Sequence, residues 1–365
     1  MTNTKVSTNS KEFEFYKNYA TFVIPKLEKL ESERKKLLQT VLTFTIGAIA
    51  LYILFAIILG ISPLLFIIEL VLTIFIIHYA FIFNNKIKSF NDKIKTICTT
   101  ELLETFGSLY WFPKATLISD KQIHKSELFG NYEGRVNDDT FSGTYKGVDF
   151  VVSETIMTNL LQGVKNAMAW PVFTGVIIMI DSNKTIKNKT IVTTKGDMNV
   201  KNSEPLLWIS TIMLIIYFFT LPELPIGISI FLSILALLTC VLGKTFFRKK
   251  KDETLNSVIL EDPEFNKKYE VLSSDQIEGR YLVTTAFMER FKTLHTAFGS
   301  NKAKCAFFDD KIMFALSTGK NLFELTGGMF FSLKENAEQT KIFYEEISAI
   351  YEIIDYFKLA EKTGL

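Results

Sequence analysis

Residues Val41 to Leu59 read VLTFTIGAIALYILFAIIL and contain no charged side chain. After a Gly-Ile-Ser-Pro break at 60–63, a second apolar run extends from Leu64 to Phe83 and contains Glu69 and His78 as its only titratable side chains apart from tyrosine. Each run has about 20 residues, which at ~1.5 Å per residue lets a helix cross roughly 30 Å of hydrocarbon. These runs predict a transmembrane helical hairpin at 40–83.

A second pair of apolar runs, Leu206–Thr220 and Ile226–Gly243, flanks the turn Leu-Pro-Glu-Leu-Pro. Its two prolines end a helix because they lack a backbone N–H. The first arm has only about 15 strongly apolar residues, which is marginal for a full crossing. The sequence is therefore compatible with either a spanning or a re-entrant hairpin at 205–243. The prediction is four transmembrane helices in two hairpins.

Basic residues flank the apolar runs on the side away from both tight turns, and the turns themselves contain no Lys or Arg. By the positive-inside rule, the turns face outward and the longer segments face the cytoplasm. We therefore expect a multi-pass protein of the inner (cytoplasmic) membrane, with the N- and C-termini in the cytoplasm. The flanking residues are Lys29, Arg34, Lys35, Lys36, Lys86, Lys88, Lys93, Lys95, Lys244, Arg248, Lys249, Lys250 and Lys251.

The composition gives no support to a nucleic-acid partner or a metal centre. The formal net charge of +2 is too small to attract a polyanion. Cys98, Cys240 and Cys305 are far apart, and the three histidines have no paired spacing, whereas structural zinc needs four convergent ligands. We expect no metal and no cofactor, and we expect the thiols to be reduced and buried, as in a cytoplasmic setting.

The polar segments predict an α+β cytoplasmic domain with strands on both sides of the second hairpin. Apolar and polar residues alternate over 132–154 around a Lys146-Gly147 turn, which indicates a β-hairpin. Segments 84–204 and 244–365 are expected to fold together around the inserted hairpin. Further strands are expected at 172–180 and 190–194, as a pair, at 269–272, and at 303–316, which turns at Asp309-Asp310-Lys311. Helices are expected at 11–39, where Pro25 introduces a kink or starts a second helix, and at 274–295 and 335–359.

The densest polar cluster is SSDQIEGRY, which begins at Ser273. In one interpretation Asp275 is a base and Arg280 clamps an anion. In the other, Asp275 or the serine before it caps a helix, Glu278 lies near the capping-box position and Arg280 pairs with an acid. We take Asp275, Gln276, Glu278 and Arg280 as candidate binding residues and no residue as catalytic.

Glu69 and His78 are the polar residues at membrane depth. A carboxylate there is costly and is a candidate for function by default. Glu69 lies about six residues from the outer turn, within reach of the interface by snorkelling. His78 is nine residues further, roughly on the opposite face of a helix, so the two do not form one proton-relay site. Three roles are compatible with these two residues: interfacial snorkelling, hydrogen bonding between helices, and ion or proton handling.

Four stretches together resemble the bacterial family catalogued as domain of unknown function 3137. They are LEDPEFNKKYEVLSSDQIEGRYLVTTAFMERF (260–291), VFTGVIIMIDSNKTIKNKTIV (172–192), FEFYKNYATFVIPKLEKLESERKK (13–36) and FDDKIMFAL (308–316). The resemblance implies a bacterial membrane protein with an N-terminal hairpin and a cytoplasmic domain. It carries over no activity and no catalytic residue. The hairpin at 206–243 departs from the common family pattern.

The sequence contains none of the motifs GxxxxGK[ST], GxSxG, HExxH or GxGxxG. We therefore expect a non-enzymatic, membrane-anchored module whose cytoplasmic domain binds or scaffolds. Its expected partners are the lipid bilayer and either another protein or a second copy of the chain. One alternative is a small transporter or channel component that uses Glu69. The third is a membrane-bound enzyme that uses Asp275 and Arg280.

Overall fold

The structure is a computed structural model that describes residues 11–59, 66–159, 170–195, 234, 255–294, 297–300, 302–325, 332–333 and 337–357. The predicted second hairpin, 206–243, lies outside the described residues except for Ile234. The chain divides into two compact units. The first consists of Met1–Phe112, Phe141–Tyr145 and Asn321–Ile353, and the second of Pro113–Thr140, Lys146–Lys320 and Ile354–Leu365.

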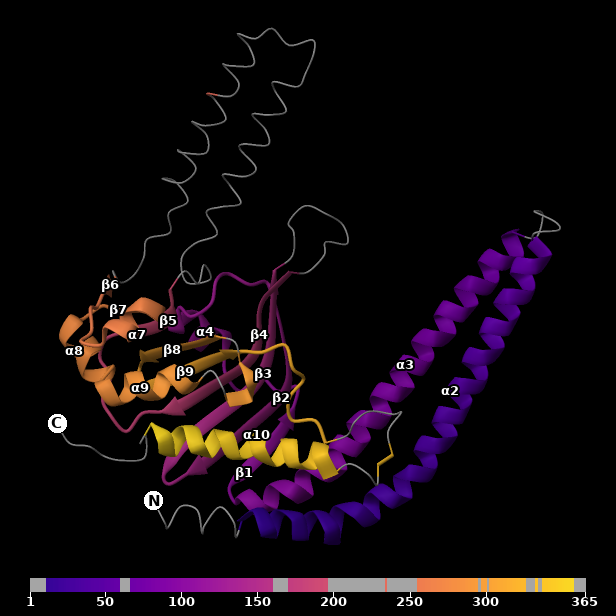
Figure 1. Cartoon of the computed structure of the whole chain (residues 1–365), viewed down its shortest axis with the longest axis horizontal. Helices are drawn as coiled ribbons and strands as arrows, with labels where there is room; N and C mark the ends of the chain where they lie inside the picture. Colours follow the sequence, from indigo (N-terminus) through magenta and orange to yellow (C-terminus); the bar gives the residue numbers. More distant parts are fainter. Residues whose placement is uncertain are drawn as a thin grey trace. The chain divides into compact units, whose positions relative to one another are not determined.

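The expected α+β class is confirmed by a large antiparallel sheet and two long apolar helices (Figure 1). The helical elements are η1 (Tyr19–Val23), α2 (Ile24–Leu59), α3 (Phe66–Leu103), η3 (Glu104–Phe106), α4 (Asp120–Ser126), α7 (Pro263–Lys268), α8 (Gln276–Leu282), α9 (Thr285–Leu294), η4 (Ala297–Gly299) and α10 (Ala337–Tyr356). The strands are β1 (Leu109–Pro113), β2 (Gly134–Tyr145), β3 (Val148–Asn159), β4 (Trp170–Asp181), β5 (Thr190–Thr194), β6 (Asn256–Ser257), β7 (Tyr269–Ser273), β8 (Lys302–Phe308) and β9 (Lys311–Ser317).

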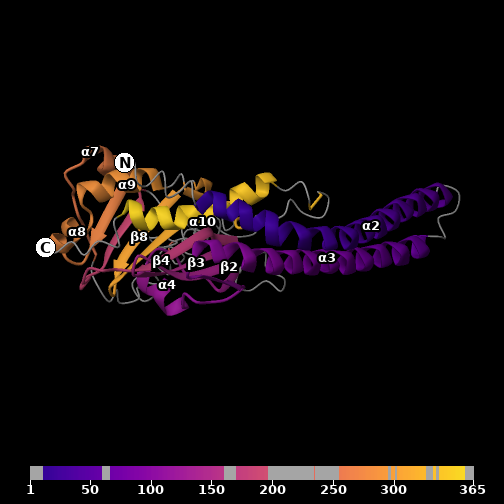
Figure 2. The same ribbon diagram turned by 90° about the horizontal axis from the view of Figure 1, so that it is seen from below.

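Helices α2 and α3 form the first predicted hairpin and run side by side in both views (Figures 1 and 2). Both are long and apolar enough to cross a membrane. In the most apolar 18-residue stretch of each helix, the share of buried residues is 0% in the first helix and 6% in the second. A core helix of a soluble protein would bury such a surface. The apolar surface of this hairpin therefore lacks a protein cover among the described residues.

The kink expected at Pro25 takes the form of a π-helical turn just before it. Residues 11–18 are helical, and η1 follows directly. The N–H of Ile24 donates to the carbonyl of Tyr19, five residues earlier. Pro25 has no N–H to donate to the carbonyl four residues before it. The wider π turn accommodates this missing bond without ending the helix.

The nine strands follow the order β1-β2-β3-β4-β9-β8-β5-β7-β6. Strands from both sides of residues 196–254 therefore join one sheet, in which β5 lies between the later strands β8 and β7. The hairpin predicted over 132–154 is confirmed as β2 and β3, and that predicted over 303–316 as β8 and β9. Both turns place two successive residues in the left-handed region, Lys146-Gly147 and Asp309-Asp310. This conformation matches the twist of two-residue hairpins.

The predicted pairing of 172–180 with 190–194 is wrong. Strand β4 pairs with β3 and β9, whereas β5 pairs with β7 and β8. After β4 the chain passes the turn between β8 and β9, where the N–H of Ser182 donates to the carbonyl of Asp310. The apolar run VIIMI in β4 is buried on both faces and takes a central position in the sheet.

Both faces of the sheet in the second unit are covered by apolar side chains. One face packs around α4, with a core of Ile118, Ile123, Leu128, Met157, Phe173, Ile177, Met179, Ile191, Leu272, Ala306, Phe308, Met313 and Ala315. The alternate residues of β8 and β9, Phe307 and Phe314, point to the other face. There Phe307 contacts Phe287 of α9, and Phe314 contacts Phe357.

The helix predicted at 274–295 is divided into α8 and α9. Thr284 lies between them, and its hydroxyl accepts from the N–H of Phe287, so the residue starts a new helix. Similarly, Asp262 caps α7 by accepting from the N–H groups of Glu264 and Phe265. Helix ends in this region are thus fixed by side chains that satisfy free backbone donors.

In the first unit, aromatic side chains join the N-terminal helix to α10. Phe15 and Phe106 both contact Tyr344, with ring centroids 4.9 Å and 5.7 Å away. Two free thiols, Cys98 here and Cys305 in the second unit, are buried as predicted. Burial raises the pKa of Cys98 to about 12, which keeps the thiol protonated. Cys240 lies outside the described residues.

Candidate functional site

The four candidate binding residues lie on and just before α8, in the second unit, and three of them hold the helix in place. Asp275 Oδ1 accepts from the N–H groups of Ile277 and Glu278 at 2.8 and 2.9 Å. Gln276 Nε2 donates to the carbonyl of Ser257 at 3.2 Å. The cap predicted for Asp275 is confirmed, and the side chain of Gln276 attaches α8 to the neighbouring strand β6.

Glu278 has a different role from the capping-box residue expected from its spacing. Its two carboxylate oxygens accept from the N–H groups of Lys187 and Asn188, each at 2.9 Å. These donors belong to the connection between β4 and β5. Glu278 therefore fixes a loop about 90 residues away in sequence, a role that local spacing does not reveal.

Arg280 is the one candidate of the four that lines a cavity. This cavity of about 480 Å³ is lined by Ile259, Leu260, Glu261, Arg280, Val283, Thr284, Thr285 and Met288. Arg280 and Glu261 are both exposed. The expected pairing of Arg280 with an acid is not found among the described residues. Its guanidinium, which has five donors, faces solvent at the cavity.

Two aliphatic side chains, one that lines this cavity and one on α8, are unusually exposed. Ile277 is 83% exposed and Ile259 is 76% exposed, the highest values among the large apolar side chains described. Ile277 and Arg280 are three residues apart on α8, and so they are neighbours on its surface. We call Ile259, Glu261, Ile277, Arg280 and Thr284 the α8 surface.

Close packing at Gly279 sets the distance between α8 and the segment that carries Ile259. A Cβ at Gly279 would lie 2.9 Å from Ser273 Cβ and 3.3 Å from Val258 Cγ2. Val258 is 2% exposed and precedes Ile259. Since Val258 points inward against Gly279, its neighbour Ile259 points outward, as in any extended chain. The absence of a side chain at Gly279 thus lets α8 pack closely against Ser273 and Val258.

An acidic cluster that the sequence analysis missed lies on β2 and β3. One carboxylate oxygen from each of Asp138, Asp139 and Glu154 lies within 4.8 Å of the others. Asp139 and Glu154 are 1% and 8% exposed. Hard cations such as Ca²⁺ prefer oxygen ligands in this kind of arrangement. The sequence did contain a signal for this cluster. In the hairpin predicted over 132–154, counting residues outward from the Lys146-Gly147 turn places Asp139 opposite Glu154.

A buried polar network lies next to this cluster and ties β2 to β3. Thr140 Oγ1 and Ser153 Oγ are 3.0 Å apart, and Thr155 Oγ1 donates to Asn137 Oδ1 at 2.9 Å. Asn137 Nδ2 donates in turn to the carbonyl of Ala115. Buried polar groups of this kind are stable when their hydrogen bonds are formed. The network accounts for the burial of Asn137, Thr140, Ser153 and Thr155 without a bound ligand.

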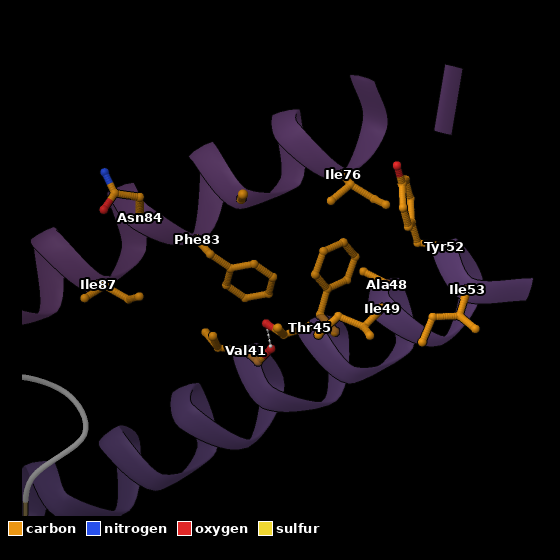
Figure 3. A pocket seen from close by; sticks show the side chains of 12 residues that line it. Val41, Thr45, Ala48, Ile49, Tyr52, Ile53, Ile76, Phe83, Asn84 and Ile87 are labelled. Atoms are coloured by element: carbon orange, nitrogen blue, oxygen red, sulfur yellow. Dashed lines mark hydrogen bonds between the residues drawn. The ribbon is translucent and has the colours of Figure 1, made fainter. Parts of the chain in front are cut away.

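A groove of about 460 Å³ lies between α2 and α3 in the first unit (Figure 3). Val41, Asn84 and Ile87 lie at one end and Tyr52, Ile53 and Ile76 at the other (Figure 3). The remaining lining residues are Phe44, Thr45, Ala48, Ile49, Ala80 and Phe83. The hydroxyl of Thr45 donates to the carbonyl of Val41, so the groove wall offers few free polar groups.

The two intramembrane polar candidates are both in α3. The side chain of Glu69 lies outside the described residues. His78 is exposed on the hairpin and is not among the residues that line the groove. The structure therefore does not bring His78 together with another candidate residue within its described part.

Comparison with known proteins identifies one family. The model of the family described as "Protein of unknown function (DUF3137)" matches residues 171–359, which is 189 of 365 residues. The crystal structure of the mycobacterial trehalose monomycolate transport factor A, TtfA, is similar with a TM-score of 0.31 and 9% identity. That similarity covers 72% of this chain and 93% of the other, and at this TM-score it carries no argument. No curated protein matches the chain.

Proposed function

The chain belongs to the DUF3137 family, and we propose that it is a membrane-anchored, non-enzymatic module that binds a protein partner through the α8 surface. The observation that carries the proposal is the exposure of Ile259, which lines the cavity with Arg280, and of Ile277, about one helical turn before Arg280 on α8. Large aliphatic side chains this exposed lose favourable burial unless a partner covers them. An arginine among apolar side chains is typical of the energetic centre of protein interfaces.

The anchor is the hairpin of α2 and α3. Almost no residue of its most apolar stretches is buried, and a pair of helices can span a bilayer because all their backbone hydrogen bonds are internal. Lys86 and Lys88 follow the apolar part of α3, which favours a cytoplasmic location for this end. On this proposal, the α8 surface also faces the cytoplasm.

The charges of the α8 surface indicate the chemistry of the partner. Asp275 and Glu278 use their carboxylates in backbone hydrogen bonds, and Asp262 pairs with Lys292 at 2.6 Å. Arg280 is the charged side chain of the motif that remains available at the cavity, accompanied by Glu261. A partner segment with an aliphatic residue for the isoleucines and a carboxylate for Arg280 fits this surface.

The proposal is tested by affinity capture of the full chain from detergent-solubilised membranes. Ile277→Asp places a charge in the centre of the α8 surface, and we expect it to abolish capture of the partner that the wild type retains. The matched control is Ile342→Asp, which makes the same change at another exposed helical isoleucine, 37% exposed. If Ile277→Asp captures the same protein as the wild type, the α8 surface is not the binding site.

A second pair of variants tests the charge chemistry. Arg280→Glu reverses the charge at the cavity and is expected to weaken the captured partner's binding at least tenfold, because a close like-charge contact costs several kcal/mol. Lys267→Glu reverses a charge on the exposed side of α7 and should leave affinity within about twofold. Equal affinities for both variants would remove Arg280 from the interface.

A further inference from the structure

The groove between α2 and α3 has the dimensions of a lipid-chain site. It extends from Val41 to Ile53 on α2 and from Ile76 to Ile87 on α3. Twelve helical steps of ~1.5 Å correspond to about 18 Å, close to half of the ~30 Å hydrocarbon thickness. Its volume of about 460 Å³ is within the usual range for ligand sites, ~300–1,000 Å³. The groove therefore spans about one leaflet of a bilayer.

Aromatic side chains determine the shape of the groove. Phe44 and Phe83, which both line it, have ring centroids 5.6 Å apart, and Phe44 stacks on Tyr79 at 4.0 Å. Phe83 is 6% exposed and points between the two helices (Figure 3). Small residues, Ala48 and Ala80, leave the space that these rings do not fill. The cavity is thus built by the packing of the hairpin.

One end of the groove is basic, and the other is not. Asn84 lines this end, and Lys88 lies four residues later on the same helical face. Lys86 Nζ lies 6.0 Å from the centroid of the Phe83 ring, at the groove wall. No carboxylate pairs with Lys86 or Lys88 among the described residues. Two cations at the mouth of an apolar groove complement an acyl chain that carries an anionic headgroup.

We propose that this groove binds one acyl chain of an anionic phospholipid from the cytoplasmic leaflet, with the headgroup beside Lys86 and Lys88. The inference rests on the membrane anchoring proposed above. It goes further because it assigns one lipid class to one site on the hairpin. A bilayer supplies acyl chains along the whole hairpin, but the basic mouth selects among headgroups.

The test uses the full chain in phosphatidylcholine vesicles that contain a trace of either spin-labelled phosphatidylglycerol or spin-labelled phosphatidylcholine. Electron paramagnetic resonance measures the fraction of label whose motion the protein restricts. We expect phosphatidylglycerol to bind about 25-fold more tightly than phosphatidylcholine, because each of the two lysines near an anionic lipid contributes roughly fivefold. Equal restriction of the two labels would overturn the proposal.

Two variants locate the site. Ala48→Phe fills the groove and should remove the selective component, whereas the control Ala50→Phe makes the same change at an exposed alanine outside the lining and should retain it. The double variant Lys86→Gln, Lys88→Gln leaves the helix packing unaltered and should make the two lipids equal. Selectivity that survives both Ala48→Phe and the lysine variant would contradict the assignment.

The remaining outcomes separate this proposal from its premises. If the wild type fails to float with vesicles, the anchor proposal fails and the lipid site fails with it. If the wild type floats but shows no selective lipid, only the lipid site fails. If Ala48→Phe abolishes a chemically cross-linked dimer while the lipid signal stays unchanged, the groove is a contact between two copies of the chain, and the lipid assignment is wrong.

Discussion

At the scale of single residues, the SSDQIEGRY motif divides into side chains that build the structure and one that faces solvent at the cavity. Asp275 and Glu278 both direct their carboxylates at backbone N–H groups, whereas Arg280 lines the cavity. The interpretation of Asp275 as a helix cap is therefore confirmed. A charged acceptor that binds two backbone donors stabilises a fold more than a neutral one does.

Glu278→Ala is expected to destabilise the protein by about 2 kcal/mol, because the N–H groups of Lys187 and Asn188 lose charged acceptors. Urea unfolding of the full chain in detergent measures the change. Glu264→Ala, on the exposed side of α7, serves as the control and should cost less than about 0.5 kcal/mol. Equal losses in the two variants would show that the Glu278 hydrogen bonds contribute nothing specific.

The contact between Asp262 and Lys292 predicts a pH dependence. The hydrogen bond from Lys292 and those from the N–H groups of Phe265 and Glu264 hold the pKa of Asp262 below its ordinary value of 3.8. A carboxyl whose pKa is lowered by folding contributes stability above the unfolded pKa, and this is lost as pH falls through the folded pKa.

The melting temperature of the wild type should therefore fall more steeply below about pH 4 than that of Asp262→Asn, which cannot titrate at this position. Glu261→Gln, one residue earlier and without such hydrogen bonds in the described residues, is the control and should keep the wild-type slope. Parallel pH profiles for wild type and Asp262→Asn would contradict the predicted contribution.

At the scale of elements, the position of α8 depends on the space at Gly279. Gly279→Ala improves helix propensity by up to ~1 kcal/mol, but its Cβ would lie 2.9 Å from Ser273 Cβ. Overpacking of a core contact costs ~1–3 kcal/mol, so the net effect is expected to be a loss of about 1 kcal/mol and weaker partner capture.

The control is Gly47→Ala in α2, where nothing lies within 4 Å of the added carbon. There only the higher helix propensity of alanine acts, and thermal unfolding should show that the free energy of unfolding rises by up to about 1 kcal/mol. Two stabilising results would mean that α8 can move away from Ser273 and Val258 without loss, and that its position is not fixed by Gly279.

Local elements were predictable from the sequence because their signals are local. Apolar length identified the hairpin of α2 and α3, and alternation around Lys146-Gly147 identified β2 and β3. The order of the strands was not predictable, since β9 pairs with β4 through contacts 130 or more residues apart in sequence. Likewise, the cap at Asp275 follows from spacing, but the partners of Glu278 at residues 187 and 188 depend on the tertiary fold.

At the scale of the whole molecule, a strongly apolar hairpin and an α+β domain occur in one chain of 365 residues. The central claim is that such a chain holds the α8 surface at a membrane, where it meets a protein partner. The sequence predicted the anchor and the domain class, but the α8 surface emerged only from the exposure of Ile259 at the cavity and of Ile277 about one turn before Arg280.

The most direct measurement is photo-cross-linking in intact membranes with a photoreactive amino acid at position 277 of the full chain. The account predicts a discrete adduct with one protein in the membrane fraction, absent when the same amino acid replaces Ile342 and weakened by Arg280→Glu. A chain found in the soluble fraction, or adducts at 277 no more specific than those at 342, would contradict it.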